Sequence, residues 1–138
     1  MSQFHLAFKV KDIESTYHFY HEILNCEVGR KTNDWIDFNF FGHQLSAHVS
    51  KNIPDLDYCG KVDQVAVPIP HFGCIIDKDE FNTIKAKLLK NSIHFIIEPQ
   101  TRYKGKVSEQ ETMFVLDFSN NPIEFKSFTA EDAIFKMF

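Results

Sequence analysis

Two histidines and one glutamate stand at positions from which they could bind one metal ion together. His5 and His71 occupy equivalent places in two similar segments, residues 4–10 and 70–76, in which apolar residues alternate with others. Glu124 lies between two apolar residues of a third alternating segment. Side chains on a strand alternate between faces, so all three residues point away from the apolar face and can converge if the sheet curls. Two imidazoles and one carboxylate leave up to three positions of an octahedral ion open, as a ferrous oxygenase needs for substrate and dioxygen.

Each of these residues also has an ordinary structural interpretation. A histidine on a strand is often a half-buried side chain with satisfied hydrogen bonds, and a glutamate near the end of a sheet is usually solvated. Spacing and alternation alone leave ligation and these structural roles both open. His18 and His21 lie three residues apart on a predicted helix. They have no third ligand nearby, which favours surface packing for this pair.

Two groups of polar residues could line the same cavity. In the alternating run 44–49, Gln44 or His48 could supply a fourth metal ligand, and His48 could instead act as a general acid or base. The polar segment 98–112 is long for a hairpin connection, and such loops are either functional or mobile.

Candidate substrate contacts lie in and beside that polar segment. Arg102 could bind an anionic or phenolic substrate, and Gln110 is a second candidate for substrate binding. Tyr103 is a second candidate for the acid or base. Cys74 lies on the apolar side of its segment and is interpreted as a core residue, not a nucleophile.

The segments that carry the two histidines each lead into a predicted helix. Asp12 is placed to cap the first helix, and Asp77 or Asp79 the second. Asn25 follows the first helix, where a left-handed residue is tolerated. Apolar residues recur at spacings of three and four in both helices. In the first helix they are Ile13, Tyr17, Tyr20 and Leu24.

Alternating runs bounded by Gly, Asn, Asp and Pro predict the remaining strands. These runs are residues 26–30, 35–40, 44–49, 94–97, 112–116 and 123–126. We therefore expect an α+β fold in which two βαβββ modules form a curled mixed sheet. The modules cover about 4–50 and 70–128, the connector 51–69 packs across an edge or forms a short extra strand, and residues 129–138 form a C-terminal helix. The whole chain, 1–138, is expected to be a single domain.

Composition excludes several classes of protein. With 43% hydrophobic and 25% charged residues, the 138-residue chain is neither disordered nor fibrous. A formal net charge of −4 argues against nucleic-acid binding. There is no apolar run long enough for a membrane span and no secretory signal at the start. Three widely spaced cysteines without a CxxC pair fit a reducing cytoplasm.

The paired modules, with His on the first strand of each and Glu on the last strand, resemble the vicinal oxygen chelate superfamily. This superfamily includes glyoxalase I, fosfomycin-resistance thiol transferases, bleomycin-resistance proteins and type I extradiol dioxygenases. The most specific part is the closing run 113–125, although Phe118 stands where the family pattern has Pro and Asn120 where it has Gly. Asn tolerates left-handed angles, so the turn is expected to persist. Residues 70–73, 97–99, 102–105 and 109–114 resemble a subfamily described as predicted extradiol-type dioxygenases.

The resemblance implies that His5, His71 and Glu124 bind one divalent ion. It implies an Fe(II) extradiol-type dioxygenase that acts on a small diol-like substrate, with Mn, Ni or Zn as possible metals. Members of this size often form homodimers whose sites combine His from one subunit with His and Glu from the other, whereas other members pair both halves within one chain, and the sequence leaves both arrangements open. Ring-cleaving members usually carry four modules, whereas this chain has two.

Two alternatives stay open. The first is a lyase, isomerase or transferase of the glyoxalase or fosfomycin-resistance type. Glyoxalases commonly use a Glu on the last strand of the first module, where this chain offers Gln44, Ser46 or His48. The second is a non-catalytic module that binds a small molecule, which the presence of all three ligand residues disfavours.

Overall fold

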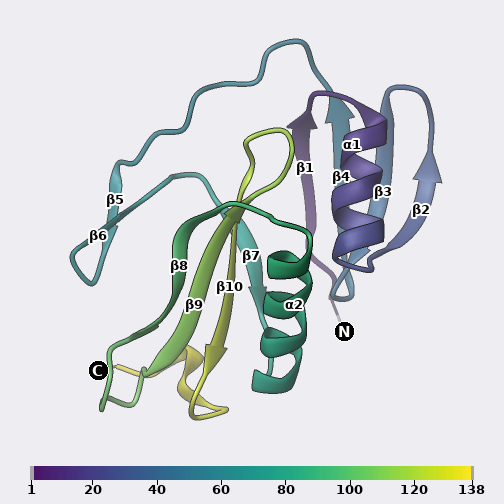
Figure 1. The fold of residues 1–138 in the computed structure, drawn as a ribbon. Helices are drawn as coiled ribbons and strands as arrows, with labels where there is room; N and C mark the ends of the chain where they lie inside the picture. Colours follow the sequence, from purple (N-terminus) through teal and green to yellow (C-terminus); the bar gives the residue numbers. More distant parts are fainter. Residues whose placement is uncertain (1, 138) are drawn as a thin grey trace. The chain divides into compact units, whose positions relative to one another are not determined.

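The chain forms two compact units in the computed structural model, which describes residues 2–137 (Figure 1). Unit 1 runs to Asp55 and also includes the turn Asp117–Asn121. Unit 2 consists of Leu56–Leu116 and the chain from Pro122 onward. No helix among the described residues is long and apolar enough to span a membrane.

Unit 1 is a four-stranded sheet with one helical layer. Its elements are β1 (His5–Val10), α1 (Ile13–Tyr17), the π-helix η1 (His18–Ile23), β2 (Glu27–Lys31), β3 (Trp35–Phe40) and β4 (His43–Val49). The strand order is β1-β4-β3-β2, with β1 parallel to β4 and the other pairs antiparallel. The Asp12 carboxylate caps α1 by accepting a hydrogen bond from the Ser15 backbone N–H at 2.7 Å, as its sequence position predicts.

Unit 2 repeats this plan. Its elements are β7 (Phe72–Ile75), α2 (Lys78–Lys90), β8 (Phe95–Arg102), β9 (Gln110–Leu116) and β10 (Pro122–Phe128), in the strand order β7-β10-β9-β8. Strand β7 is parallel to β10. Asp77 caps α2, and the helix buries Phe81, Ile84 and Leu88 at helical spacing. The predicted α+β fold of two βαβββ modules is confirmed.

The connector between the modules forms a small hairpin of β5 (Gly60–Val62) and β6 (Val65–Val67). The sequence predicted one short extra strand or a segment packed across an edge here. Asp63 and Gln64, at the tip, both have positive φ angles, of 48° and 67°. This is the backbone geometry of the tight two-residue turns that suit the twist of antiparallel strands.

Three elements differ from the sequence-based expectation. The first helix changes to π geometry after Tyr17, so the neighbours Phe19 and Tyr20 are both buried and a regular 3.6-residue stripe is interrupted. Strand β8 extends to Arg102, which shortens the polar loop to residues 103–109. At the C-terminus a single 3-10 turn, η2 (Ala133–Phe135), stands where a helix over 129–138 was predicted.

The C-terminal segment lacks the packing that a helix of this length needs. Ala133 is buried, but Phe135 is 96% exposed and Met137 is 87% exposed. Short helices are marginal in water unless an apolar face packs against the protein. Phe138, the last residue of the predicted helix, lies outside the described residues.

A buried tyrosine holds the turn Asp117–Asn121 in unit 1. The Tyr20 hydroxyl donates a hydrogen bond to the Asp117 carboxylate at 2.8 Å, and neither side chain is exposed by more than 6%. The same carboxylate accepts hydrogen bonds from the backbone N–H groups of Ser119 and Asn121 and from the Asn121 side-chain amide. Tyr20 is therefore a structural residue that joins the helix to the turn.

We expect Tyr20→Phe to lower the free energy of unfolding by about 1–3 kcal/mol, because the buried Asp117 carboxylate loses a donor. Urea denaturation followed by circular dichroism measures this change. The matched variant Tyr17→Phe removes a hydroxyl from a partly exposed side chain on the neighbouring turn and is expected to change stability by within about 0.5 kcal/mol. Equal losses in the two variants would contradict the structural role of the Tyr20 hydroxyl.

Candidate metal centre

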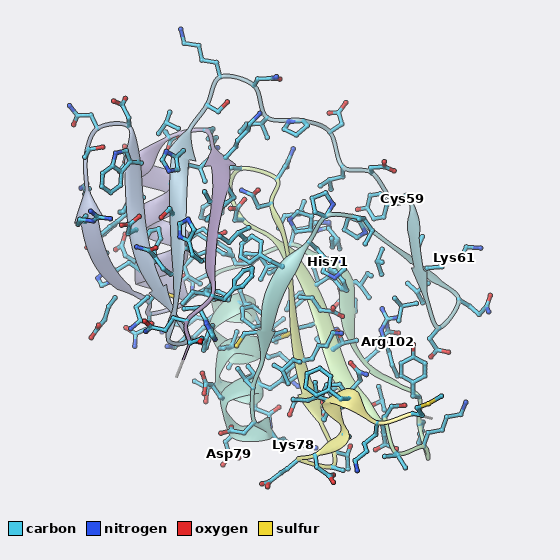
Figure 2. The ribbon with its side chains drawn as sticks, turned by 180° about the vertical axis from the view of Figure 1, so that it is seen from behind. Cys59, Lys61, His71, Lys78, Asp79 and Arg102 are labelled. Atoms are coloured by element: carbon cyan, nitrogen blue, oxygen red, sulfur yellow. The ribbon has the colours of Figure 1, made fainter. Side chains whose placement is uncertain are left out.

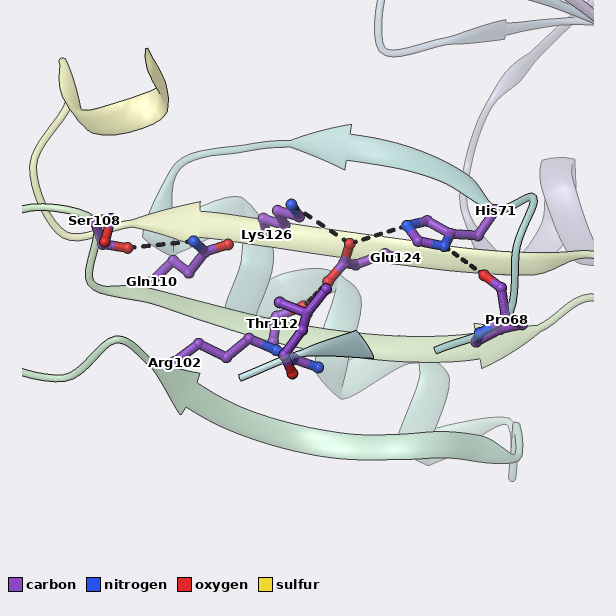
Figure 3. A network of polar contacts seen from close by, with 9 residues as sticks. Pro68, His71, Arg102, Ser108, Gln110, Thr112, Glu124 and Lys126 are labelled. Atoms are coloured by element: carbon purple, nitrogen blue, oxygen red, sulfur yellow. Dashed lines mark hydrogen bonds and ion pairs between the residues drawn. The ribbon is translucent and has the colours of Figure 1, made fainter. Parts of the chain in front are cut away.

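His71 and Glu124 meet in unit 2, as the sequence predicts for two of the three ligands (Figure 3). His71 immediately precedes β7, and Glu124 lies on the adjacent parallel strand β10. The His71 Nε2 atom lies 3.5 Å from Glu124 Oε1. The imidazole is further fixed by edge-to-face packing on Phe114, with ring centroids 4.8 Å apart. An imidazole nitrogen and a carboxylate oxygen therefore converge on one point.

The ring orientation of His71 leaves Nε2 for ligation. Its Nδ1 atom is 2.7 Å from the backbone carbonyl oxygen of Pro68. A carbonyl oxygen only accepts hydrogen bonds, so Nδ1 must carry a proton and donate it. Metal-binding histidines are commonly oriented in this way, with one ring nitrogen held by a carbonyl and the other free to bind the ion.

Glu124 is held in its ionised form although the residue is buried, with only 7% of its surface exposed. The Thr112 hydroxyl donates to Oε2, and the Lys126 ammonium lies 3.6 Å from Oε1. Burial alone would raise the pKa of Glu124, but the hydrogen bonds from His71 and Thr112 hold it below its usual value. The hydrogen bond to Glu124 raises the pKa of His71 in turn, against the opposing effect of burial.

These two shifts predict a pH window for the stability of the metal-free protein. The pKa of His71 is raised in the folded protein. Its contribution to the free energy of unfolding is therefore complete below the unfolded-state pKa of 6.5 and is lost as the pH rises through the folded-state pKa. The pKa of Glu124 is lowered in the folded protein. Its contribution to the free energy of unfolding is therefore complete above the unfolded-state pKa of 4.5 and is lost as the pH falls through the folded-state pKa. The ion pair thus stabilises the protein most between these two limits.

We expect the melting temperature of the protein in chelator to exceed that of Glu124→Gln most strongly between pH 4.5 and 6.5. The difference is expected to shrink on both sides of this window. Thermal unfolding of both proteins at intervals of pH measures it. A difference that stays constant from pH 4 to pH 9 would contradict an ionic contact between His71 and Glu124.

A narrow cleft gives access to this pair. Its volume is about 230 Å³, and it is lined by His71–Ile75, Glu124 and Lys126. Gly73 pairs with Glu124 in the strand register, and a Cβ atom at Gly73 would lie 1.6 Å from the Glu124 carbonyl oxygen. Only glycine lets the two strands approach this closely, and their approach places the side chains of His71 and Glu124 together.

We expect Gly73→Ala to displace β7 from β10 and to destabilise the protein by about 1–3 kcal/mol, the usual cost of overpacking. Thermal or urea denaturation measures the loss. Gly29 on β2 provides the matched control, because a Cβ atom there would meet Asp37 at an ordinary 3.4 Å. A Gly73→Ala protein as stable as Gly29→Ala would show that the close approach of the strands is not required.

Five residues on three neighbouring strands form one polar face of the unit 2 sheet. Thr112 reaches Glu124, and Lys126 lies two residues beyond Glu124 on the same side. Gln110 lies two residues before Thr112, and Arg102 is its register partner on β8. These five residues, Arg102, Gln110, Thr112, Glu124 and Lys126, are called the polar face below. Thr112 and Lys126 were not singled out from the sequence, although their spacing from Gln110 and Glu124 is a signal.

Arg102, which is labelled in Figure 2, is buried with an unpaired charge. The side chain is 2% exposed, and Nη1 donates to the backbone carbonyl of Val62 on β5. Its Nε and Nη2 atoms are buried without a hydrogen-bond partner, as is the hydroxyl of Ser108. An isolated buried charge is costly, so the two unpaired guanidinium nitrogens are a feature that the fold itself does not compensate.

The remaining predicted site residues lie elsewhere in their units. Gln110 donates to the carbonyl of Ser108 at 3.2 Å and is 6% exposed. Tyr103 begins the loop 103–109 with a φ of 54°. In unit 1, His48 is exposed beside Trp35 and pairs with Lys9, roughly 13 Å along β1 from His5 at about 3.3 Å per residue. A shared role for His48 and His5 therefore gains no support within unit 1.

His5 lies on β1 of unit 1, where its Nδ1 atom is 2.7 Å from Gln44 Oε1. A cleft of about 520 Å³ opens beside it and is also lined by Arg30, Asp37 and Gln44. In unit 2 no third His, Cys, Asp or Glu among the described residues joins His71 and Glu124 in a group that could hold a metal. That His5 completes the ligand set stays a prediction.

Burial raises the pKa of the Cys74 thiol to about 11. A thiol with so high a pKa is almost wholly protonated at neutral pH, so it is a poor nucleophile. This agrees with the prediction that Cys74 is not a nucleophile, but the residue is only partly buried and does not belong to the core as predicted.

The paired βαβββ modules define a protein of the glyoxalase-like class. A crystal structure of a glyoxalase/bleomycin resistance protein/dioxygenase from Alicyclobacillus acidocaldarius is 31% identical to this chain. It superposes with a TM-score of 0.79 over 97% of this chain and 96% of that chain. The chain therefore belongs to the glyoxalase/bleomycin resistance/dioxygenase family of the vicinal oxygen chelate superfamily, as the sequence predicted.

Two further comparisons carry more specific names. The metallothiol transferase FosB of Lysinibacillus sphaericus is 25% identical over 130 residues, which cover 94% of this chain and 84% of that protein. The fosfomycin resistance protein FosX of Listeria monocytogenes shares the fold, with a TM-score of 0.74 and 17% identity over 97% of this chain and 98% of that chain. No protein-family model matches the sequence. The predicted homodimer stays a prediction.

Proposed function

We propose that the protein is a divalent-metal-dependent transferase of the fosfomycin-resistance type, which adds a thiol to a small anionic substrate. The sequence left this function open as the alternative to an extradiol-type dioxygenase. Two named relatives support it, because one is a metallothiol transferase and the other a fosfomycin resistance protein. Neither name supports iron or ring cleavage specifically.

The observation that carries the choice is the unpaired charge of Arg102. A neutral diol substrate would leave this buried guanidinium without a counterion. A phosphonate or carboxylate group would accept hydrogen bonds from Nε and Nη2 together, in the two-pronged geometry that guanidinium favours. Arg102 and Glu124 belong to the same polar face, and in the strand register Arg102 is level with Phe128, four residues along β10 from Glu124.

The proposed donor set fits a divalent ion. His71 Nε2 and a Glu124 oxygen would hold it, with His5 as the proposed third ligand, and nitrogen and oxygen donors of this kind suit Mn, Fe, Ni and Zn. When bound, the ion supplies Lewis acidity toward an oxygen atom of the substrate. Thr112 and Pro68 keep the two ligand side chains in place through their hydrogen bonds.

Thiol transfer to an epoxide such as fosfomycin balances simply. The thiolate sulfur forms a bond to an epoxide carbon, the bond from that carbon to oxygen breaks, and the oxygen takes up the proton that the thiol released. Arg102 would hold the anionic group during this step and so orient the ring toward the thiol.

The test is to load the purified protein with Mn, Fe, Ni or Zn and to incubate it with fosfomycin and a thiol such as cysteine or glutathione. We expect thiol consumption and an adduct with the summed mass of both reactants, and we expect neither with Glu124→Gln. Parallel samples with catechol, monitored for oxygen uptake, and with a hemithioacetal test the dioxygenase and glyoxalase functions. Oxygen uptake with iron and catechol, without thiol transfer, would overturn the proposal in favour of a dioxygenase.

A further inference from the structure

A chain of hydrogen bonds and one ion pair in unit 1 leads from Arg30 to His5. We infer that Asp37 positions His5 by fixing, through Gln44, which ring nitrogen of the imidazole carries the proton. This inference rests on the proposed function insofar as His5 is a metal ligand. Asp37 is then a positioning residue that acts through Gln44.

Asp37 lies on β3 and is 5% exposed. The Ser46 hydroxyl donates to its Oδ1 atom at 2.6 Å, and Arg30 Nε lies 3.4 Å from Oδ2. The side-chain amide of Gln44 donates to Oδ2 at 3.4 Å. Every one of these contacts presents a donor to Asp37, as a carboxylate requires, because it can only accept.

The carboxylate decides the orientation of the Gln44 amide. An amide has a donor end and an acceptor end, and only the NH₂ end is attractive toward Asp37. With that end toward Asp37, the carbonyl oxygen Oε1 is turned toward His5, where it lies 2.7 Å from Nδ1. An amide flipped by half a turn would place two oxygen atoms against each other at the Asp37 end.

The amide orientation in turn decides the tautomer of His5. Because Oε1 only accepts, Nδ1 of His5 must donate, and the proton of the neutral ring sits on Nδ1. Nε2 then holds a lone pair and is the nitrogen available to a metal ion. With the amide flipped, Nδ1 would become the acceptor and the proton would occupy Nε2, which would block ligation.

Unit 2 reaches the same result by a different route. His71 donates from Nδ1 to the backbone carbonyl of Pro68, and a carbonyl cannot flip. Unit 1 uses a side-chain amide in that place, which can flip unless something holds it. The buried carboxylate of Asp37 supplies that restraint. Both proposed histidine ligands thus present Nε2. The Gln44 side-chain oxygen accepts a hydrogen bond from His5 in this arrangement, so it does not serve as a fourth metal ligand.

The primary test is the tautomer of His5 in the full-length, metal-free protein, measured by long-range ¹H–¹⁵N NMR of the imidazole. We expect an unprotonated Nε2 and a protonated Nδ1 in the unaltered protein. In Asp37→Asn the amide at position 44 can adopt either orientation, so we expect a mixture of both tautomers. The affinity for Mn²⁺ or Zn²⁺ is expected to fall by roughly 10- to 100-fold, as for other residues that orient a ligand.

A rescue variant separates positioning from a general loss of structure. In the double variant Asp37→Asn/Gln44→Glu the carboxylate at position 44 accepts from Nδ1 without any help from position 37. We expect this variant to restore the Nδ1–H tautomer and the metal affinity. Asp34→Asn, an exposed change of the same kind in the turn before β3, is expected to alter neither measurement.

The outcomes distinguish this inference from the proposed function. An unchanged His5 tautomer in folded Asp37→Asn, or a double variant that fails to restore it, would overturn the positioning role of Asp37. A protein with the expected tautomers that binds no divalent metal would overturn the proposed function and leave the role of Asp37 in the tautomer standing. Circular dichroism of each variant verifies that the fold is retained.

Discussion

Replacing His71 with alanine is expected to remove nearly all bound divalent metal while leaving a folded protein. The side chain supplies one of the two donors that already converge in unit 2, at 3.5 Å between Nε2 and Glu124 Oε1. Loss of a direct ligand is expected to exceed the roughly 10- to 100-fold loss of affinity that follows removal of an outer partner. Metal analysis of protein purified under gentle, anaerobic conditions measures the occupancy.

The fold is expected to survive this change because Glu124 keeps its contacts with Thr112 and Lys126. His94→Ala is the matched control, since it removes an exposed imidazole from the same unit. We expect full metal content in that variant, and melting temperatures in chelator that differ little between the two. Full metal content in His71→Ala would contradict the assignment of His71 as a ligand.

Local rules predicted most of the fold correctly. Asp12 and Asp77 cap their helices because a short side-chain oxygen reaches the free N–H groups of the first turn. Asn25 and Asn120 have φ angles of 63° and 64°, in the left-handed region that their turn positions require. Each of these features depends only on a few residues that are adjacent in the chain, so the sequence alone is enough to predict it.

Features that depend on distant partners were less predictable. The sequence placed Arg102 in a polar loop, because its neighbours are polar, whereas the structure buries it at the end of β8 beneath the β5–β6 hairpin. Its burial depends on Val62, forty residues earlier in the chain. The predicted C-terminal helix does not form, because an apolar pattern gives a stable helix only where another surface of the protein covers it.

In the candidate site, too, local features were predicted and features that depend on distant residues were not. His71 and Glu124 were predicted from strand parity, which depends only on alternation, and they meet as expected. Asp37 was missed, although an acid in the middle of an otherwise alternating apolar strand is itself a signal of an inward polar group. Our proposal of a transferase instead of a dioxygenase uses the burial of Arg102 without a counterion, which the sequence did not reveal.

Replacing Arg102 with methionine is expected to weaken binding of an anionic substrate while leaving the metal-free protein as stable as before or more stable. The guanidinium is 2% exposed, and two of its nitrogen atoms lack partners, so the folded protein carries the desolvation cost of a poorly compensated charge. Apolar replacement of a buried charge is often neutral or stabilising. A residue that packs only for structure would show the opposite result, a loss of stability with binding unchanged.

Loss of a buried charged partner of a ligand typically costs about 2–5 kcal/mol, so affinity for fosfomycin is expected to fall by at least about 30-fold. Isothermal titration calorimetry of the metal-loaded protein measures the binding, and urea denaturation in chelator measures the stability. Lys104→Met, on the exposed loop that follows β8, removes a nearby positive charge of the same sign and controls for long-range electrostatics. We expect it to change affinity only slightly, because solvent screens an exposed charge. If Arg102→Met unfolds more easily and binds fosfomycin as well as the unaltered protein does, the charge is structural and the substrate need not be an anion.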